Sequence, residues 1–217
     1  MKLTRVSVFA AVALAVLVPV ILYAQEGKPA GDKPAAEKPA AKPAEGAVSA
    51  SGKYKLDPVH SSNAFRIRHL AADFYGRFNE MTGDCTLDDA HPEASTFDVR
   101  IKTASIDTNN EARDKHLRSP ELFDAEKYAE IAFKSTKVQK VDDKNWSLTG
   151  DMTFHGVTKT ITVQIATPQA VKGMKGETRL GFGATFDIKR SEYGMGTMVG
   201  PLGDEVRIMV GIEGVRE

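Results

Sequence analysis

The chain has 217 residues, in which 29 lysines and arginines balance 29 aspartates and glutamates. A formal charge of zero supplies no broad positive field, so nucleic-acid binding is disfavoured. The single cysteine, Cys85, excludes an internal disulfide, and stability must therefore come from strand pairing and apolar burial. We interpret Cys85 as a small buried hydrophobe rather than a reactive thiol.

The first 24 residues have the layout of an export signal. Lys2 and Arg5 precede an apolar run over residues 6–24, which predicts a signal peptide or signal anchor over residues 1–24. Cleavage after Ala24 competes with retention as an anchor, because Leu22 fits a small-residue cleavage site poorly and the run approaches the ~20 residues that span a bilayer. We expect a periplasmic or secreted protein, either released or anchored to the inner membrane by an uncleaved N-terminal segment.

Residues 25–52 form a Lys/Pro/Ala-rich segment in which Lys-Pro-Ala occurs four times. This composition cannot supply a core, and its prolines favour an extended backbone, so we predict a disordered linker. The linker is either a tether that sets the reach of the domain or a passive tail. The folded domain is then expected over residues 53–217.

Apolar and polar residues alternate with a period of two beyond residue 52, which is typical of half-buried β-strands. The clearest runs cover residues 97–102, 146–154, 157–165, 180–188 and 206–212. Shorter runs fall near residues 54–56, 65–67, 78–87 and 131–138. Together they predict an all-β domain of about eight or nine strands. His155-Gly156 separates two of the runs and predicts a two-residue hairpin turn with positive φ at both residues.

One short helix is expected to interrupt the strands. Thr108 is predicted as its N-cap and Glu111 as the third helical residue, with the helix over residues 109–119 ahead of Pro120. Arg113, His116 and Leu117 then share one face. This face either covers a ligand or is purely structural, with Leu117 closing a barrel end and both basic residues paired with carboxylates.

Several motifs occur in a fixed order across the predicted domain. They are Leu56-Asp57-Pro58-Val59-His60-Ser61, Phe65-Arg66-Ile67-Arg68-His69-Leu70, Ser105-Ile106-Asp107-Thr108-Asn109, Arg113-Asp114-Lys115-His116-Leu117-Arg118-Ser119, His155-Gly156-Val157-Thr158-Lys159 and Arg190-Ser191-Glu192-Tyr193-Gly194-Met195. In these motifs the chain resembles the YceI-like family. It departs from the family at Tyr54, where tryptophan is frequent, and at Ala129, where proline is common.

The resemblance implies an extended antiparallel, lipocalin-like β-barrel of about eight strands with one short helical insertion. It also implies a ligand along the barrel axis, because family members bind polyprenyl pyrophosphates, quinones or long-chain amides. The expected partner is therefore a long-chain isoprenoid or quinone-type lipid. Transient membrane contact is also expected, and the oligomeric state is left open.

The candidate ligand-binding residues are basic or adjoin basic residues: Arg66, His69, Arg113, Asp114 and His116. Guanidinium and imidazolium groups suit phosphate or quinone oxygens. Because Arg66 and His69 differ by three positions on a strand, only one of them should face the ligand.

Metal and cofactor sites are not expected. The five histidines lack the close spacing of a zinc site. The glycine-rich stretch over residues 194–200 fails the dinucleotide fingerprint and predicts a flexible apolar loop, whose two methionines either line a ligand portal or fill space.

Two function classes remain at this point. The favoured one is a non-catalytic, exported lipid carrier or sequestering protein. The alternative is an exported lipid-modifying hydrolase or isomerase that uses Asp114 and His116 for proton transfer, although the sequence has no serine elbow or catalytic cysteine motif. A barrel with a completely filled interior is the third possibility.

Overall fold

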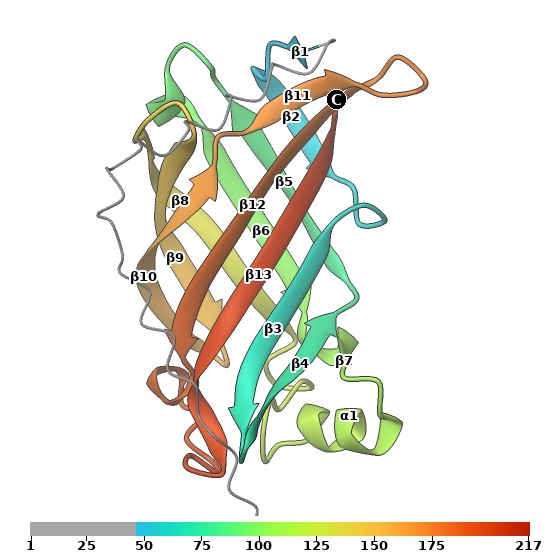
Figure 1. The fold of residues 1–217 in the computed structure, drawn as a ribbon, viewed down its shortest axis with the longest axis vertical. Helices are drawn as coiled ribbons and strands as arrows, with labels where there is room; N and C mark the ends of the chain where they lie inside the picture. Colours follow the sequence, from blue (N-terminus) through green and yellow to red (C-terminus); the bar gives the residue numbers. More distant parts are fainter. Residues whose placement is uncertain (1–46) are drawn as a thin grey trace, which may run out of the picture. The chain divides into compact units, whose positions relative to one another are not determined.

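The computed structural model describes residues 47–217, and the predicted signal and most of the predicted linker lie outside them. Eight antiparallel strands close into a barrel in the order β12, β10, β9, β8, β6, β5, β2 and β13, with β13 returning to β12 (Figure 1). Their bounds are β2 Gly52–Leu56, β5 Met81–Leu87, β6 Thr96–Lys102, β8 Glu130–Lys140, β9 Asn145–Phe154, β10 Val157–Ala166, β12 Thr178–Lys189 and β13 Leu202–Arg216. The expected all-β, antiparallel barrel with a short helical insertion is confirmed.

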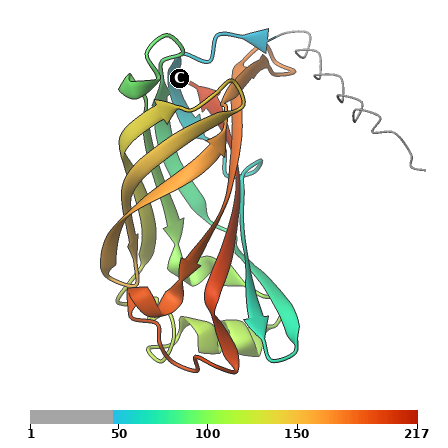
Figure 2. The same cartoon turned by 60° about the vertical axis from the view of Figure 1, so that its left-hand side comes forward.

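The remaining elements lie toward the two ends of the barrel. They are β1 Ala47–Val48, β3 Ser62–His69, β4 Ala72–Phe78, β7 Ile106–Asp107, β11 Gln169–Lys172, the helix α1 Glu111–Arg118 and the 3₁₀ turns η1 Pro92–Ala94, η2 Thr103–Ser105 and η3 Arg190–Tyr193. Figure 1 places β1 and β11 at one end and α1 with the β3–β4 hairpin at the other. Figure 2 shows the β12–β13 connection at the α1 end as well.

Strand β13 is long enough to serve two partners along one edge. Its last residues pair with β2, and its first half pairs with β3. Strands β3 and β4 therefore extend the wall beyond β2 toward α1. This extension brings the predicted site residues of β3 to the same end as the helix.

The hairpin between β9 and β10 forms as its sequence predicts. Phe154 pairs with Val157, and the two residues between them have φ values of 49° at His155 and 74° at Gly156. The Tyr128 ring packs over this turn, with its centroid 4.4 Å from that of the His155 ring. A Cβ at Gly156 would lie 2.4 Å from Tyr128 Cε1, so both the backbone angle and the packing require glycine.

Two local predictions are wrong. The run over residues 78–87 is not one strand, because the chain bends at Asn79 and Glu80, whose backbone N–H groups donate to the Ser105 carbonyl and hydroxyl oxygens. The helix begins at Glu111 with Asn110 as its N-cap, and the Asn110 side chain accepts from the backbone N–H of Arg113. Thr108 does not cap the helix, because its Oγ1 accepts from Arg113 Nε and not from a backbone N–H of the first helical turn.

The barrel end away from α1 is filled by a cluster of buried side chains. Its largest fully enclosed members include Tyr54, Phe97 and Leu180. Cys85 belongs to this cluster and is 2% exposed, and burial raises the pKa of its thiol to about 12. Cys85 is thus a buried small hydrophobe, as predicted. None of the helices within residues 47–217 is long and apolar enough to span a membrane.

Candidate functional site

A cavity of about 430 Å³ occupies the barrel interior between the filled end and α1. Its volume falls within the range typical of small-molecule sites. The lining comes from inward-facing strand residues and is almost entirely aliphatic or aromatic. Among the described residues that line it, five have polar side chains: Asn63, His69, Arg113, His116 and Arg190. Such a cavity suits a long apolar ligand with few polar groups.

Alternation along β3 decides which of its predicted site residues reaches the cavity. Phe65, Ile67 and His69 line the cavity. Arg66 lies between two of them in sequence and therefore points to the outer surface, where Nη1 donates to Asp73 Oδ2 at 3.0 Å. The structure corrects the placement of Arg66 and leaves His69 as the cavity residue of this pair.

Asp114 belongs to α1, and its side chain is buried but does not line the cavity. Its Oδ1 accepts from the Thr108 backbone N–H at 2.9 Å and from the Thr108 hydroxyl. These bonds tie the helix to the segment that precedes it. Asp114 thus anchors α1, which corrects its predicted placement at the ligand.

Arg113 projects from the first turn of α1 to the edge of the cavity. Its Nε donates to Thr108 Oγ1 at 2.8 Å, and its Nη2 donates to the Thr108 carbonyl oxygen at 2.6 Å. The guanidinium also lies over the ring of Phe74. Within residues 47–217 it forms no salt bridge with a carboxylate. A positioned positive charge without an anionic partner therefore lies beside an apolar cavity.

His116 also lines the cavity, and its Nε2 lies 2.9 Å from Glu121 Oε2 at an exposed position. The sequence left open that this helix face is purely structural, with Leu117 closing the barrel end and both basic residues paired with carboxylates. His116, which has a carboxylate partner, and Leu117, which packs at this barrel end, fit that alternative. Arg113 does not fit it, because it has no carboxylate partner within residues 47–217. Asp114 and His116 make separate contacts, and no hydrogen bond joins them in the described part of the chain.

Arg190 organises the glycine-rich loop. It is 4% exposed, and it donates to the backbone carbonyl oxygens of Met195 at 2.6 Å, Thr197 at 2.7 Å, Leu202 at 3.2 Å and Gly203 at 2.8 Å. Burial lowers the pKa of its guanidinium. By gathering these carbonyls, Arg190 holds Met195 and Met198 against the cavity, where both are lining residues. The loop is therefore hydrogen-bonded in place, and both methionines lie at the cavity wall.

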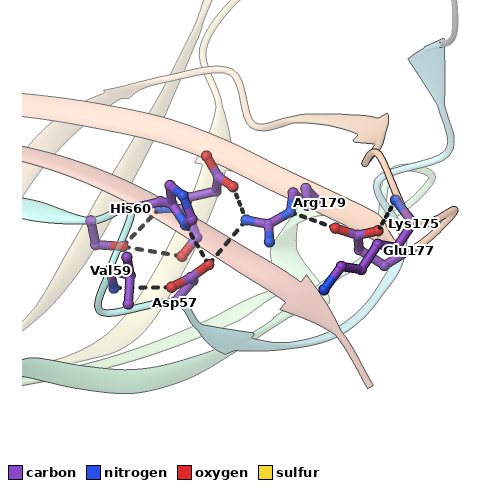
Figure 3. Close-up of polar contacts among 8 residues, drawn as sticks. Asp57, Val59, His60, Lys175, Glu177 and Arg179 are labelled. Atoms are coloured by element: carbon purple, nitrogen blue, oxygen red, sulfur yellow. Dashed lines mark hydrogen bonds and ion pairs between the residues drawn. The ribbon is translucent and has the colours of Figure 1, made fainter.

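A second polar cluster lies away from this cavity, where the β2–β3 connection meets β12 and β13 (Figure 3). Asp57, His60 and Glu213 offer potential ligand atoms within 4.8 Å of one another. The Arg179 guanidinium, however, contacts Asp57 at 3.0 Å and also pairs with Glu213. It supplies the positive charge that a metal ion would bring. We therefore interpret the cluster as a structural ion network.

The pKa of Asp57 is lowered to about 2, first by its hydrogen bond with His60, whose Nδ1 lies 2.8 Å from Oδ2. The backbone N–H of Val59 and the guanidinium of Arg179 lower it further. Arg179 also donates to Glu177 at 2.9 Å. Asp57 therefore remains ionised well into the acid range.

Two cavity residues were not among the sequence-based candidates, Asn63 and Arg190. Asn63 has the same parity on β3 as Phe65 and Ile67, so its position as a polar residue on an apolar face was a usable signal. The role of Arg190 had no such signal, because its partners are backbone carbonyls that only the folded loop brings together.

The amino-acid sequence is similar to a known protein family and to individual bacterial proteins. Residues 54–214 match the YceI-like domain. A UPF0312 protein of Photorhabdus laumondii is 39% identical over 175 residues, which cover 80% of this chain and 91% of that protein.

Two solved structures share the architecture. The crystal structure of the Campylobacter jejuni YceI protein has a TM-score of 0.62 and 30% identity, covering 69% of this chain and 90% of that chain. A polyisoprenoid binding domain from Saccharophagus degradans has a TM-score of 0.60 and covers 76% of this chain and 98% of that chain. At 15% identity, the second likeness concerns the fold alone.

Proposed function

Because the chain belongs to the YceI-like family, we propose that it is an exported, non-catalytic binding protein that holds one long isoprenoid-type lipid inside its barrel. The observation that carries this proposal is the apolar cavity with the guanidinium of Arg113 at its edge, which forms no salt bridge with a carboxylate within residues 47–217. The name of the Saccharophagus domain, which describes polyisoprenoid binding, is consistent with the ligand class. Transport, storage or sequestration of the lipid are all served by such a site.

The apolar lining by itself gives affinity but little selectivity. Removing each CH₂-sized group from water stabilises a complex by about 0.8 kcal/mol. A lipid that leaves a bilayer, however, starts in surroundings as apolar as the barrel interior, so this contribution nearly cancels. The few polar side chains must then decide which lipid is retained.

Arg113, His116 and His69 are the polar residues proposed to meet the head group at the α1 end. A guanidinium binds phosphate oxygens through charge-assisted hydrogen bonds and also donates to quinone carbonyls. Arg113 is prepared for this role because Thr108 and Phe74 hold it in position before any ligand arrives. A polyprenyl phosphate or a quinone-like lipid is the proposed ligand.

Exposed apolar side chains at the same end support transient contact with a membrane. Leu70 at the β3–β4 turn is 67% exposed, and Met198 and Val199 in the neighbouring loop are 48% and 49% exposed. The Leu70 backbone N–H donates to the Pro201 carbonyl oxygen, so this turn and the loop adjoin. We propose that this apolar rim, defined as Leu70, Met198 and Val199, touches the bilayer while a lipid enters or leaves.

Catalysis by Asp114 and His116 finds less support in the geometry. Asp114 is buried and bound to Thr108, whereas His116 is exposed and bound to Glu121. A shared substrate would need both groups at one atom or one bond. Binding is the function that the arrangement supports better.

The test is native mass spectrometry of the full-length protein, produced with export and purified without detergent, followed by organic extraction. We expect one bound lipid with a long unsaturated chain. Ala184→Phe would place a ring in the cavity and should abolish the adduct, whereas Thr185→Phe changes the neighbouring, exposed side chain and should retain it. Absence of lipid, with no uptake of polyprenyl phosphate or quinone, would overturn the proposal.

A further inference from the structure

A single amide lies inside the apolar cavity, away from the basic residues at its α1 end. Asn63 is 5% exposed and is a lining residue on the inward face of β3. Its backbone pairs with that of Val210, whose side chain also lines the cavity. Within residues 47–217, no hydrogen bond involves the Asn63 side chain. Its donor and acceptor atoms therefore face the cavity without a partner among the described residues.

The Asn63 amide is not among the fully enclosed polar groups without a partner, so its atoms remain accessible from the cavity. The neighbouring inward positions on β3 are Phe65 and Ile67, so a polar side chain at position 63 interrupts an otherwise apolar inward face. A leucine would fit the surroundings with no unsatisfied group. The position of Asn63 thus points to a partner that the described part of the chain does not supply.

Asn63 is well separated from the charged end of the cavity. It lies six residues before His69 on one strand, which corresponds to about 20 Å along the barrel wall. The guanidinium and imidazole groups at the α1 end therefore do not reach it. A charged group buried beside Asn63 would lack a counter-ion, whereas a neutral group with an oxygen atom would be matched by an amide.

We propose that Asn63 forms an interior subsite that hydrogen-bonds a neutral carbonyl or hydroxyl oxygen of the bound lipid. This inference rests on the proposed lipid-binding function and narrows its ligand class. The ligand is a lipid with a neutral oxygen on the part that enters the barrel, rather than a lipid whose buried part is pure hydrocarbon. An anionic head group, where one is present, stays at Arg113.

The test compares three probes with the full-length protein: an isoprenoid ketone, the isoprenoid hydrocarbon of the same chain length, and an isoprenoid phosphate. Asn63→Leu should weaken ketone binding about three- to tenfold, the worth of one neutral hydrogen bond, and leave hydrocarbon binding equal or tighter. Arg113→Gln is the matched control at the other end. It should weaken binding of the phosphate far more than binding of the ketone, whereas Asn63→Leu should weaken binding of the ketone more than binding of the phosphate.

A second measurement uses the wild-type protein and so does not depend on how the variant folds. The ¹⁵N side-chain amide signals of Asn63, assigned by their absence in Asn63→Leu, should shift on addition of the ketone and stay in place with the hydrocarbon. Equal effects of Asn63→Leu on ketone and hydrocarbon, with no ketone-specific shift, would overturn the subsite and assign Asn63 to an internal water molecule. If the wild-type protein binds none of the three probes, the lipid-binding function itself fails and the subsite with it.

Discussion

The guanidinium of Arg113 lies over the ring of Phe74, with Cζ 4.5 Å from the ring centroid. Phe74 lines the cavity, so this stacking fixes a positive charge where the apolar interior meets solvent. Thr108 holds the same guanidinium from the other direction through its hydroxyl and carbonyl oxygens. The charge is therefore positioned by the protein, and no described carboxylate neutralises it.

Replacing Arg113 by Gln should weaken binding of an isoprenoid phosphate by about 1.5–3 kcal/mol, or roughly ten- to a hundredfold, because a charge-assisted hydrogen bond is lost. The isoprenoid hydrocarbon of the same chain length should bind almost unchanged, because it offers no acceptor to the guanidinium. Titration with both ligands measures the difference. Lys115→Gln removes the same charge from a helix residue that does not line the cavity, and it serves as the control. Equal loss for both ligands, together with a lower melting temperature, would make Arg113 a structural residue only.

The apolar rim should control lipid exchange rather than affinity. Replacing Leu70 and Val199 by Ser should slow lipid transfer between the protein and vesicles several-fold, because contact with the bilayer precedes release, while the equilibrium Kd stays similar, since neither side chain lines the cavity. Stopped-flow transfer of a fluorescent isoprenoid measures the rate. Val141→Ser alters a comparably exposed side chain, 58% exposed, at the β8–β9 turn and should leave the rate unchanged. A slowing of equal size in Val141→Ser would contradict a role for the rim.

Asp114→Ala should lower the free energy of unfolding by about 2–3 kcal/mol, because two donors of Thr108 lose a buried charged acceptor. Chemical denaturation measures this change, and hydrogen exchange should show faster exchange over residues 108–118. Glu111→Ala removes an exposed carboxylate from the same helix and should have little effect. Stability equal to that of Glu111→Ala would show that Asp114 does not anchor α1.

The ion network at Asp57 predicts how stability responds to acid. The folded pKa of Asp57 is about 2, below its usual 3.8, so its ionised form stabilises the fold above about pH 4 and this contribution is lost as the pH falls through 2. Wild-type protein should therefore exceed Asp57→Asn in unfolding free energy by a constant amount above pH 4. The gap should shrink between pH 4 and pH 2.

Urea unfolding of both proteins across this pH range measures the gap. The comparison isolates Asp57, because Asp107, whose pKa is also lowered to about 2 through hydrogen bonds from the Asn109 backbone N–H, Asn79 and Arg77, titrates equally in both proteins. A gap that stays constant down to pH 2, or widens, would show that the network with His60 and Arg179 does not depress the pKa.

Local patterns in the sequence were sufficient for the strands and for one turn. Side chains alternate across a strand with period two, so Trp146, Leu148, Met152 and Phe154 indicate a buried face without knowledge of any partner strand. The His155-Gly156 turn is equally local, because the positive φ values depend on those two residues. The basic face of α1 followed from helical spacing, although its N-cap did not, since Asn110 and Thr108 both have capping side chains. Only the folded structure shows that Asn110 accepts from the Arg113 backbone N–H, whereas Thr108 Oγ1 accepts from Arg113 Nε.

The amino-acid sequence by itself determined the period of the strands, the position of the helix within a residue or two and the family to which the chain belongs. Tertiary structure alone decided that Arg66 faces outward, that Arg190 gathers four backbone carbonyls and that Asn63 lines the cavity without a side-chain partner among the described residues. Because side chains alternate along a strand, Asn63 and Arg66 lie on opposite faces of β3. The pairing of β13 with both β12 and β3 closes the barrel and so determines which of these faces is the interior. Hydrogen bonds between distant segments depend on that closure, which no local pattern contains.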